Sequence, residues 1–98
     1  MSEINLSLLK PHPLNSEIYG DAADADLVES IESNGILTPI LITGDKAEIG
    51  PNVIISGHRR YYAAKKLGAS TVPVIISDLT DAMDIEEALI VANKQRAK

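Results

Sequence analysis

Residues 53–68 read VIISGHRRYYAAKKLG, and the pattern changes from that of a strand to that of a helix at Gly57. The β-branched apolar run before the glycine favours a buried strand. The residues after it include strong helix formers, and the run ends at Gly68, a residue typical of helix C-termini. The segment therefore predicts a strand that leads directly into a helix over residues 58–67.

The first turn of that predicted helix carries two arginines, where helix amides have partial positive charge. Gly57 lets a ligand approach the backbone, and the guanidinium groups of Arg59 and Arg60 can make forked, charge-assisted bonds to phosphate oxygens. His58 could add a donor whose charge depends on pH. The pattern indicates an anion site, but pairing of the arginines with acidic residues of a neighbouring helix explains it equally well.

Short strands and helices are predicted on both sides of this unit. A proline at position 73 places its strand at a sheet edge or marks the start of that strand. The expected order is a strand over Ile4–Leu9, a loop to about Asp21, an acidic helix from Ala22 to Asn34, a strand over Pro39–Thr43 that pairs with the strand at 53–56, a strand over Val72–Ile76, and a last helix capped by Thr80 or Asp81 with Ile85, Ala88, Leu89 and Ala92 inward. We therefore expect a small α/β (α+β) fold with a mixed sheet.

Composition limits the classes of protein to which the chain can belong. With 98 residues, 45% of them hydrophobic, it can form one small core, so we expect residues 1–98 to be a single domain. The chain has no cysteine, which excludes disulfides, thiolate metal sites and cysteine nucleophiles. It shows neither a secretory signal nor the roughly 20 apolar residues that span a bilayer, so we expect a cytoplasmic protein without membrane contact. A net charge of −5 opposes DNA binding by phosphate neutralisation alone.

The two histidines differ in their sequence context. His12 lies in a proline-flanked loop, where a single histidine is typical of the protein surface, whereas His58 lies in the arginine turn. Two histidines with scattered acidic residues do not have the spacing of transition-metal ligands, so no built-in metal site is predicted.

Four segments in order resemble the N-terminal domain of the ParB family, within the ParB/sulfiredoxin superfamily. Residues 27–42, LVESIESNGILTPILI, are similar to the first motif of that family, and residues 54–68 to its G-E-R-R turn and alanine-rich helix. VPV at 72–74 and ALIVANKQR at 88–96 resemble its V-P-V strand and its A-L-I-E-N-x-x-R segment. PHPLN at 11–15 lies where relatives have a proline- and asparagine-containing box. The resemblance covers nearly the whole chain.

The resemblance implies a ParB/sulfiredoxin-like fold whose pocket holds a nucleoside triphosphate, CTP or ATP, together with Mg²⁺ carried by the nucleotide. The phosphates would lie on the arginine turn, formed by Gly57, His58, Arg59 and Arg60. Thr38 and Pro39 of the first motif would border the nucleotide, and Asn93 and Arg96 of the last helix would close over it.

Two positions depart from the family pattern. His58 replaces the glutamate of G-E-R-R, and Ala92 replaces the glutamate that helps to hold magnesium in the partition proteins. Nucleotide binding, with or without weak CTPase-like turnover, is therefore expected. Sulfiredoxin has a catalytic cysteine in the same turn, and its chemistry is excluded here because there is no thiol.

The leading interpretation is a nucleotide-binding regulatory module related to the DNA-binding proteins of chromosome or plasmid partition, in which nucleotide orders the last helix and favours self-association. Relatives carry a helix-turn-helix after this domain, so the chain is either a fragment of a longer DNA-binding protein or a stand-alone domain with an indirect DNA role. One alternative is a phosphotransferase or nuclease on the same fold, with Glu29 as its candidate catalytic base. The other alternative is a protein-interaction domain that has lost its ligand.

Overall fold

The computed structural model describes residues 2–14, 25–35 and 38–96, with the side chains of residue 25 and residues 93–96 outside the description. A four-stranded sheet with the order β1-β4-β2-β3 forms the centre. Along the chain the elements are β1 (Ser2–Asn5), the 3₁₀ turn η1 (Leu6–Leu8), α2 (Ala25–Asn34), β2 (Ile40–Thr43), β3 (Ile54–Ser56), α3 (His58–Leu67), β4 (Thr71–Ser77) and α4 (Ala82–Arg96). This architecture confirms the predicted α/β (α+β) class.

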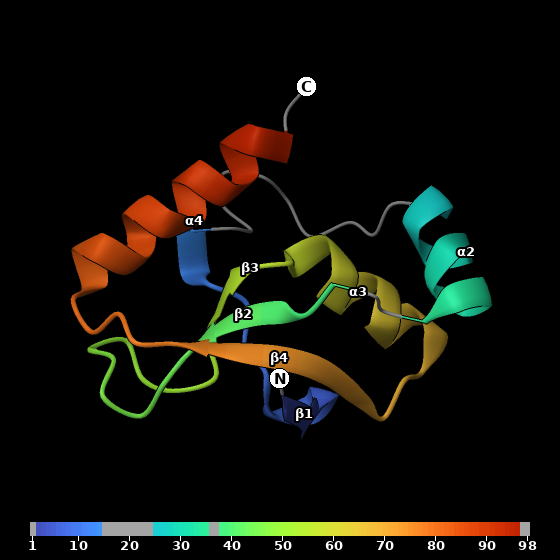
Figure 1. The fold of residues 1–98 in the computed structure, drawn as a ribbon, viewed down its shortest axis with the longest axis horizontal. Helices are drawn as coiled ribbons and strands as arrows, with labels where there is room; N and C mark the ends of the chain where they lie inside the picture. Colours follow the sequence, from blue (N-terminus) through green and yellow to red (C-terminus); the bar gives the residue numbers. More distant parts are fainter. Residues whose placement is uncertain (1, 15–24, 36–37, 97–98) are drawn as a thin grey trace.

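The sheet is mixed. β2 pairs with β3, as predicted, and this pairing is antiparallel. β2 also pairs with β4 in parallel orientation, while β1 runs antiparallel to β4. Figure 1 shows α4 beside β3 at one end of the molecule and α2 against α3 at the other. None of the helices in the described residues is long and apolar enough to cross a membrane.

Helices α3 and α4 pack against opposite faces of the sheet, because neighbouring residues of a strand point to opposite sides. Tyr61 and Ala64 of α3 join one core cluster with Ile54 of β3, whereas Ile85 of α4 packs with Ile55, the next residue of that strand. The predicted inward face of α4 is confirmed: Ile85 and Leu89 are fully buried, and Ala88 and Ala92 are half-buried.

The first predicted strand, Ile4–Leu9, overlaps the observed strand β1 only at Ile4 and Asn5. The strand ends at Asn5, and the chain turns into η1, where the Leu9 N–H donates to the Leu6 carbonyl at 3.1 Å. Because residues three apart eclipse one another in a 3₁₀ turn, Leu6 and Leu9 enter the core on the same side. The predicted strand assumed that apolar residues alternate with polar ones, whereas the buried Leu6 and Leu9 are three residues apart, as a 3₁₀ turn requires.

Pro73 lies in an inner strand, so the expected edge position is wrong, and it is the third residue of β4 rather than the first. The Leu6 N–H donates to the Ser70 carbonyl at 3.0 Å, and hydrogen-bonded pairs alternate along an antiparallel ladder. The register therefore makes Glu3–Pro73 a non-hydrogen-bonded pair. Pairing with β2 begins one residue later, at Val74. The missing proline N–H is thus not needed by either neighbour.

The helix ends follow the sequence signals. Asp81 caps α4, because its Oδ1 accepts the Met83 N–H at 2.8 Å, and Glu48 Oε1 accepts the Ala82 N–H at 2.8 Å. α3 ends at Gly68 in the left-handed conformation, as predicted. The described part of α2 begins at Ala25, and the predicted start at residue 22 lies outside the described residues.

Candidate functional site

Gly57 connects β3 to α3 in a conformation that favours glycine. Its φ is 103° and its ψ is 22°, in the left-handed region. A Cβ at this position would lie 3.0 Å from Nη2 of Arg60 and 3.2 Å from Cγ1 of Ile40. The predicted strand–glycine–helix turn is therefore confirmed, with the Arg60 guanidinium lying against the glycine.

Arg60 places its guanidinium group in a desolvated position. Its Nη2 donates to the Pro39 carbonyl at 3.4 Å, and its Nε is buried without a hydrogen-bond partner. Burial lowers the pKa of Arg60 and the positive charge of Arg59 lowers it further, yet a guanidinium stays charged at neutral pH. Within the described residues, no carboxylate pairs with Arg60. A cation in this state is typical of a site completed by an anion.

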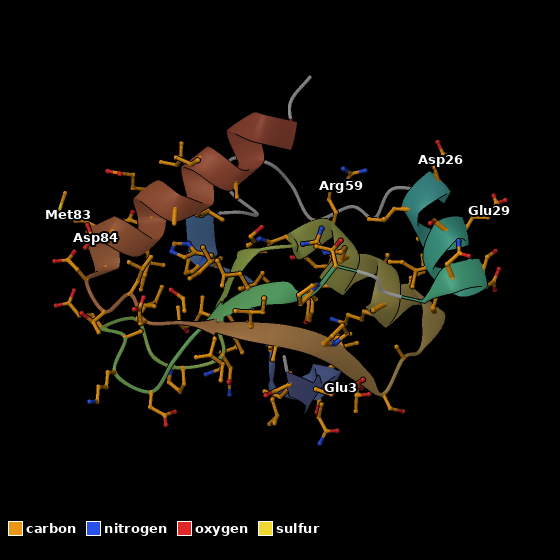
Figure 2. All side chains as sticks on the ribbon, in the orientation of Figure 1. Glu3, Asp26, Glu29, Arg59, Met83 and Asp84 are labelled. Carbon is orange, nitrogen blue, oxygen red and sulfur yellow. The ribbon has the colours of Figure 1, made fainter. Side chains whose placement is uncertain are left out.

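The contact between Arg60 and Pro39 brings two predicted site segments together. Pro39 lies just before β2, and the preceding residue, Thr38, is exposed beside it. Arg59 is half-buried, and in Figure 2 its side chain extends away from the sheet at the N-terminal end of α3. The two arginines therefore occupy the same turn at different depths.

Glu29, the candidate base, is exposed on α2. In Figure 2 its side chain points outward from α2, away from α3. In the described part of the chain, no group of three or more histidine, aspartate or glutamate side chains is arranged to hold a metal ion.

His58 and His12 form a buried pair. The Nε2 of His58 accepts the His12 N–H at 3.0 Å, and the Nδ1 of His12 accepts the Leu14 N–H at 3.1 Å. Both side chains are at most 3% exposed. Burial lowers the pKa of His12, and the negative charge of Glu86 opposes that shift. The surface position expected for His12 is thus wrong. His58 uses Nε2 as an acceptor inside the protein, and its expected donation to phosphate stays a prediction.

The sequence matches the ParB N-terminal domain family over residues 1–93. The chain belongs to this family. It is 36% identical over 97 residues to Stage 0 sporulation protein J of Bacillus subtilis, an alignment that covers 98% of this chain and 33% of the relative. This ParB N-terminal domain therefore spans about a third of the length of that relative.

Solved structures agree with the family assignment. The C-terminally truncated chromosome-partitioning protein ParB from Caulobacter crescentus, complexed with CTP-gamma-S, is 31% identical with a TM-score of 0.76, over 99% of this chain and 54% of that one. The same protein complexed to the centromeric parS site is 26% identical with a TM-score of 0.72, over 100% of this chain and 49% of that one. Sulfiredoxin from Arabidopsis thaliana, 24% identical over 90% of this chain and 94% of its own, shares the fold with a TM-score of 0.66.

A cavity of about 470 Å³ lies between β3 and α4 of this ParB-type domain, and none of residues 57–60 lines it. It is bounded by Ser56, which precedes Gly57, and by Ala92, which precedes Asn93. The side chains of Asn93 and Arg96 themselves lie outside the described residues. Sequence reasoning missed most of the lining, because it assigned the apolar residues to the core; the lining includes Leu41, Ile55, Leu79, Ala88 and Val91.

Gly57→Ala is expected to lower the free energy of unfolding by about 2–3 kcal/mol, from the left-handed backbone and from displacement of the Arg60 and Ile40 side chains. The matched control is Gly50→Ala, where φ is 100° but nothing lies within 4 Å, so about 1–2 kcal/mol is expected. Urea denaturation of both variants measures the difference. Equal losses would show that the close contacts at Gly57 contribute nothing.

Proposed function

We propose that this ParB-type domain binds a nucleoside triphosphate, CTP or ATP, with its phosphates on the turn formed by residues 57–60. The observation that carries the proposal is the desolvated Arg60 guanidinium with its buried, unpartnered Nε beside Gly57. Phosphate oxygens would supply the charge-assisted acceptors that this group lacks. The CTP-gamma-S complex of Caulobacter ParB favours CTP over ATP.

The remaining contacts follow from the placement of the other site residues. The N-terminus of α3, which begins at His58, would face the phosphates with its partial positive charge, alongside Arg59. Thr38 and Pro39 would border the nucleotide, because Pro39 already contacts Arg60. In this proposal, Asn93 and Arg96 close over the nucleotide from α4.

Mg²⁺ would arrive on the nucleotide. It keeps several of its waters and needs only one or two protein oxygens, so a dedicated cage of carboxylates is not required. Since His58 and Ala92 stand where glutamates occur in the family, we expect slow hydrolysis or none.

In the larger context, we propose that the domain acts as a regulatory module of a cytoplasmic DNA-partition system, self-associating when nucleotide is bound. The names of its relatives, chromosome-partitioning proteins, support this role, as does the parS complex of Caulobacter ParB. With a net charge of −5, this chain by itself is expected to contact DNA only through a further domain.

The test is calorimetric titration of CTP, ATP, GTP and UTP, with and without Mg²⁺, into the wild type and into an Arg59→Ala, Arg60→Ala double variant. We expect one nucleotide to bind and the double variant to weaken it at least ~100-fold, since each charged hydrogen bond contributes about 1.5–3 kcal/mol. Lys66→Ala, which removes an exposed charge from the other end of α3, should leave the affinity unchanged. Failure of all four nucleotides to bind would instead favour a protein-interaction domain, and turnover with a second substrate would favour an enzyme.

A further inference from the structure

The histidine pair uses both imidazoles as hydrogen-bond acceptors. Nε2 of His58 receives the backbone N–H of His12, and Nδ1 of His12 receives that of Leu14. A neutral imidazole has one acceptor nitrogen and one N–H, whereas a protonated ring has two donors and no acceptor. Protonation of either ring would therefore place a donor against a backbone donor inside the protein.

The pair joins the arginine turn to the segment Pro11–Leu14. One end of this segment is already fixed to β3: the Lys10 N–H donates to the Asn52 carbonyl at 2.9 Å, and the Ile54 N–H donates to the Lys10 carbonyl at 2.8 Å. Beyond Lys10, the contact between His12 and His58 ties the segment to the first residue of α3. A change at the two rings would thus loosen the segment locally and leave its attachment to the sheet intact.

We propose that His12 and His58 are positioning residues for the phosphate turn, which hold segment 11–14 against the first turn of α3 only while both imidazoles are neutral. Acid would release the segment and weaken nucleotide binding. The nucleotide part of this inference rests on the proposed function, whereas the release of the segment does not.

Burial, against the effect of a nearby carboxylate, favours the neutral state of His12. Among the described residues, Glu86 of α4 faces His12, Arg59 and Arg60 follow His58 in α3, Lys10 precedes the segment, and β3 has no ionisable side chain. Glu86 favours a proton on His12, but desolvation is the larger effect and holds the pKa of His12 below its usual 6.5. Release is therefore expected only as the pH falls below about 6.5.

The first experiment needs no nucleotide. Imidazole carbon-bound protons and backbone amide exchange are followed by NMR from pH 8 to pH 5. After correction for intrinsic exchange, the amides of His12 and Leu14 should lose protection as the rings take up protons. The amide of Val53, which donates to Thr43 Oγ1 at 2.9 Å, should stay protected as the internal control. Protection of His12 and Leu14 that persists while the rings titrate would overturn the proposal.

The second experiment compares CTP affinity against pH in the wild type and in a His12→Asn variant. The amide oxygen of Asn takes the place of Nδ1 of His12, so the variant keeps the acceptor for the Leu14 N–H without titrating at position 12. Relative to this variant, the wild type should lose affinity by up to roughly tenfold per pH unit for the proton that His12 takes up below pH 6.5. Parallel profiles, or loss of binding by the variant at pH 8, would contradict the positioning role. If the wild type binds no nucleotide at pH 8, the proposed function fails, and amide exchange still decides whether the histidines act as inferred.

Discussion

An Arg60→Met variant is expected to lose nucleotide binding, with affinity at least ~100-fold weaker, while its fold stays intact. The loss follows from removal of forked bonds to phosphate, each worth about 1.5–3 kcal/mol. Stability should be unchanged or higher by up to about 1 kcal/mol, because the variant removes a desolvated cation without a carboxylate partner among the described residues and keeps an apolar stem in its place.

Titration calorimetry and urea denaturation of the same preparations separate the two effects. Lys66→Met is the matched control, since it also replaces a cationic side chain by methionine, but at an exposed position of α3, and it should alter neither quantity. A variant that binds nucleotide normally but unfolds at much lower urea concentration would assign Arg60 a structural role instead.

Ile85→Ala is expected to lower the free energy of unfolding by about 2–5 kcal/mol, a large part of the roughly 5–15 kcal/mol available to a domain. Ile85 is fully buried and packs on Ile55 of β3, so its truncation leaves a cavity under α4. Because α4 also carries Asn93 and Arg96, nucleotide affinity should fall together with stability.

Met83→Ala provides the comparison for that variant. Met83 lies two residues earlier in α4, is 77% exposed and points outward in Figure 2, so its truncation should change stability by less than about 0.5 kcal/mol. Thermal denaturation and nucleotide titration of the two variants measure both quantities. If Ile85→Ala lost as little stability as Met83→Ala, the attachment of α4 would not depend on the contact between Ile85 and Ile55.

Local signals predicted the unit from β3 through α3 because each of its features is set by adjacent residues. A β-branched run forms the strand, Gly57 supplies the left-handed turn, and Gly68 ends the helix. The position of Pro73 in an inner strand could not be predicted from its neighbours in the sequence. A proline fits there because of its register with Glu3, and that register is set by a contact between residues 70 positions apart.

The candidate site also combines features set by adjacent residues with contacts between residues far apart in the sequence. The arginine turn could be identified from residues 57–60 and from the family resemblance, but the depth of Arg60 depends on Pro39, 21 positions away. His12 and His58 are 46 positions apart, and no local pattern in the sequence indicates that they form a pair. Pairings across such separations come from tertiary packing, which composition and periodicity do not encode.

The antiparallel pairing of β1 with β4 has a consequence for a chain that is made from its N-terminus. β1 precedes β4 in the sequence and Ser2 lies opposite Val74, so β1 has no partner in the sheet until β4 has been synthesised. Contacts between residues so far apart in sequence slow folding relative to a protein held by local contacts. The residues of β1 therefore leave the ribosome well before they can take their native place in the sheet.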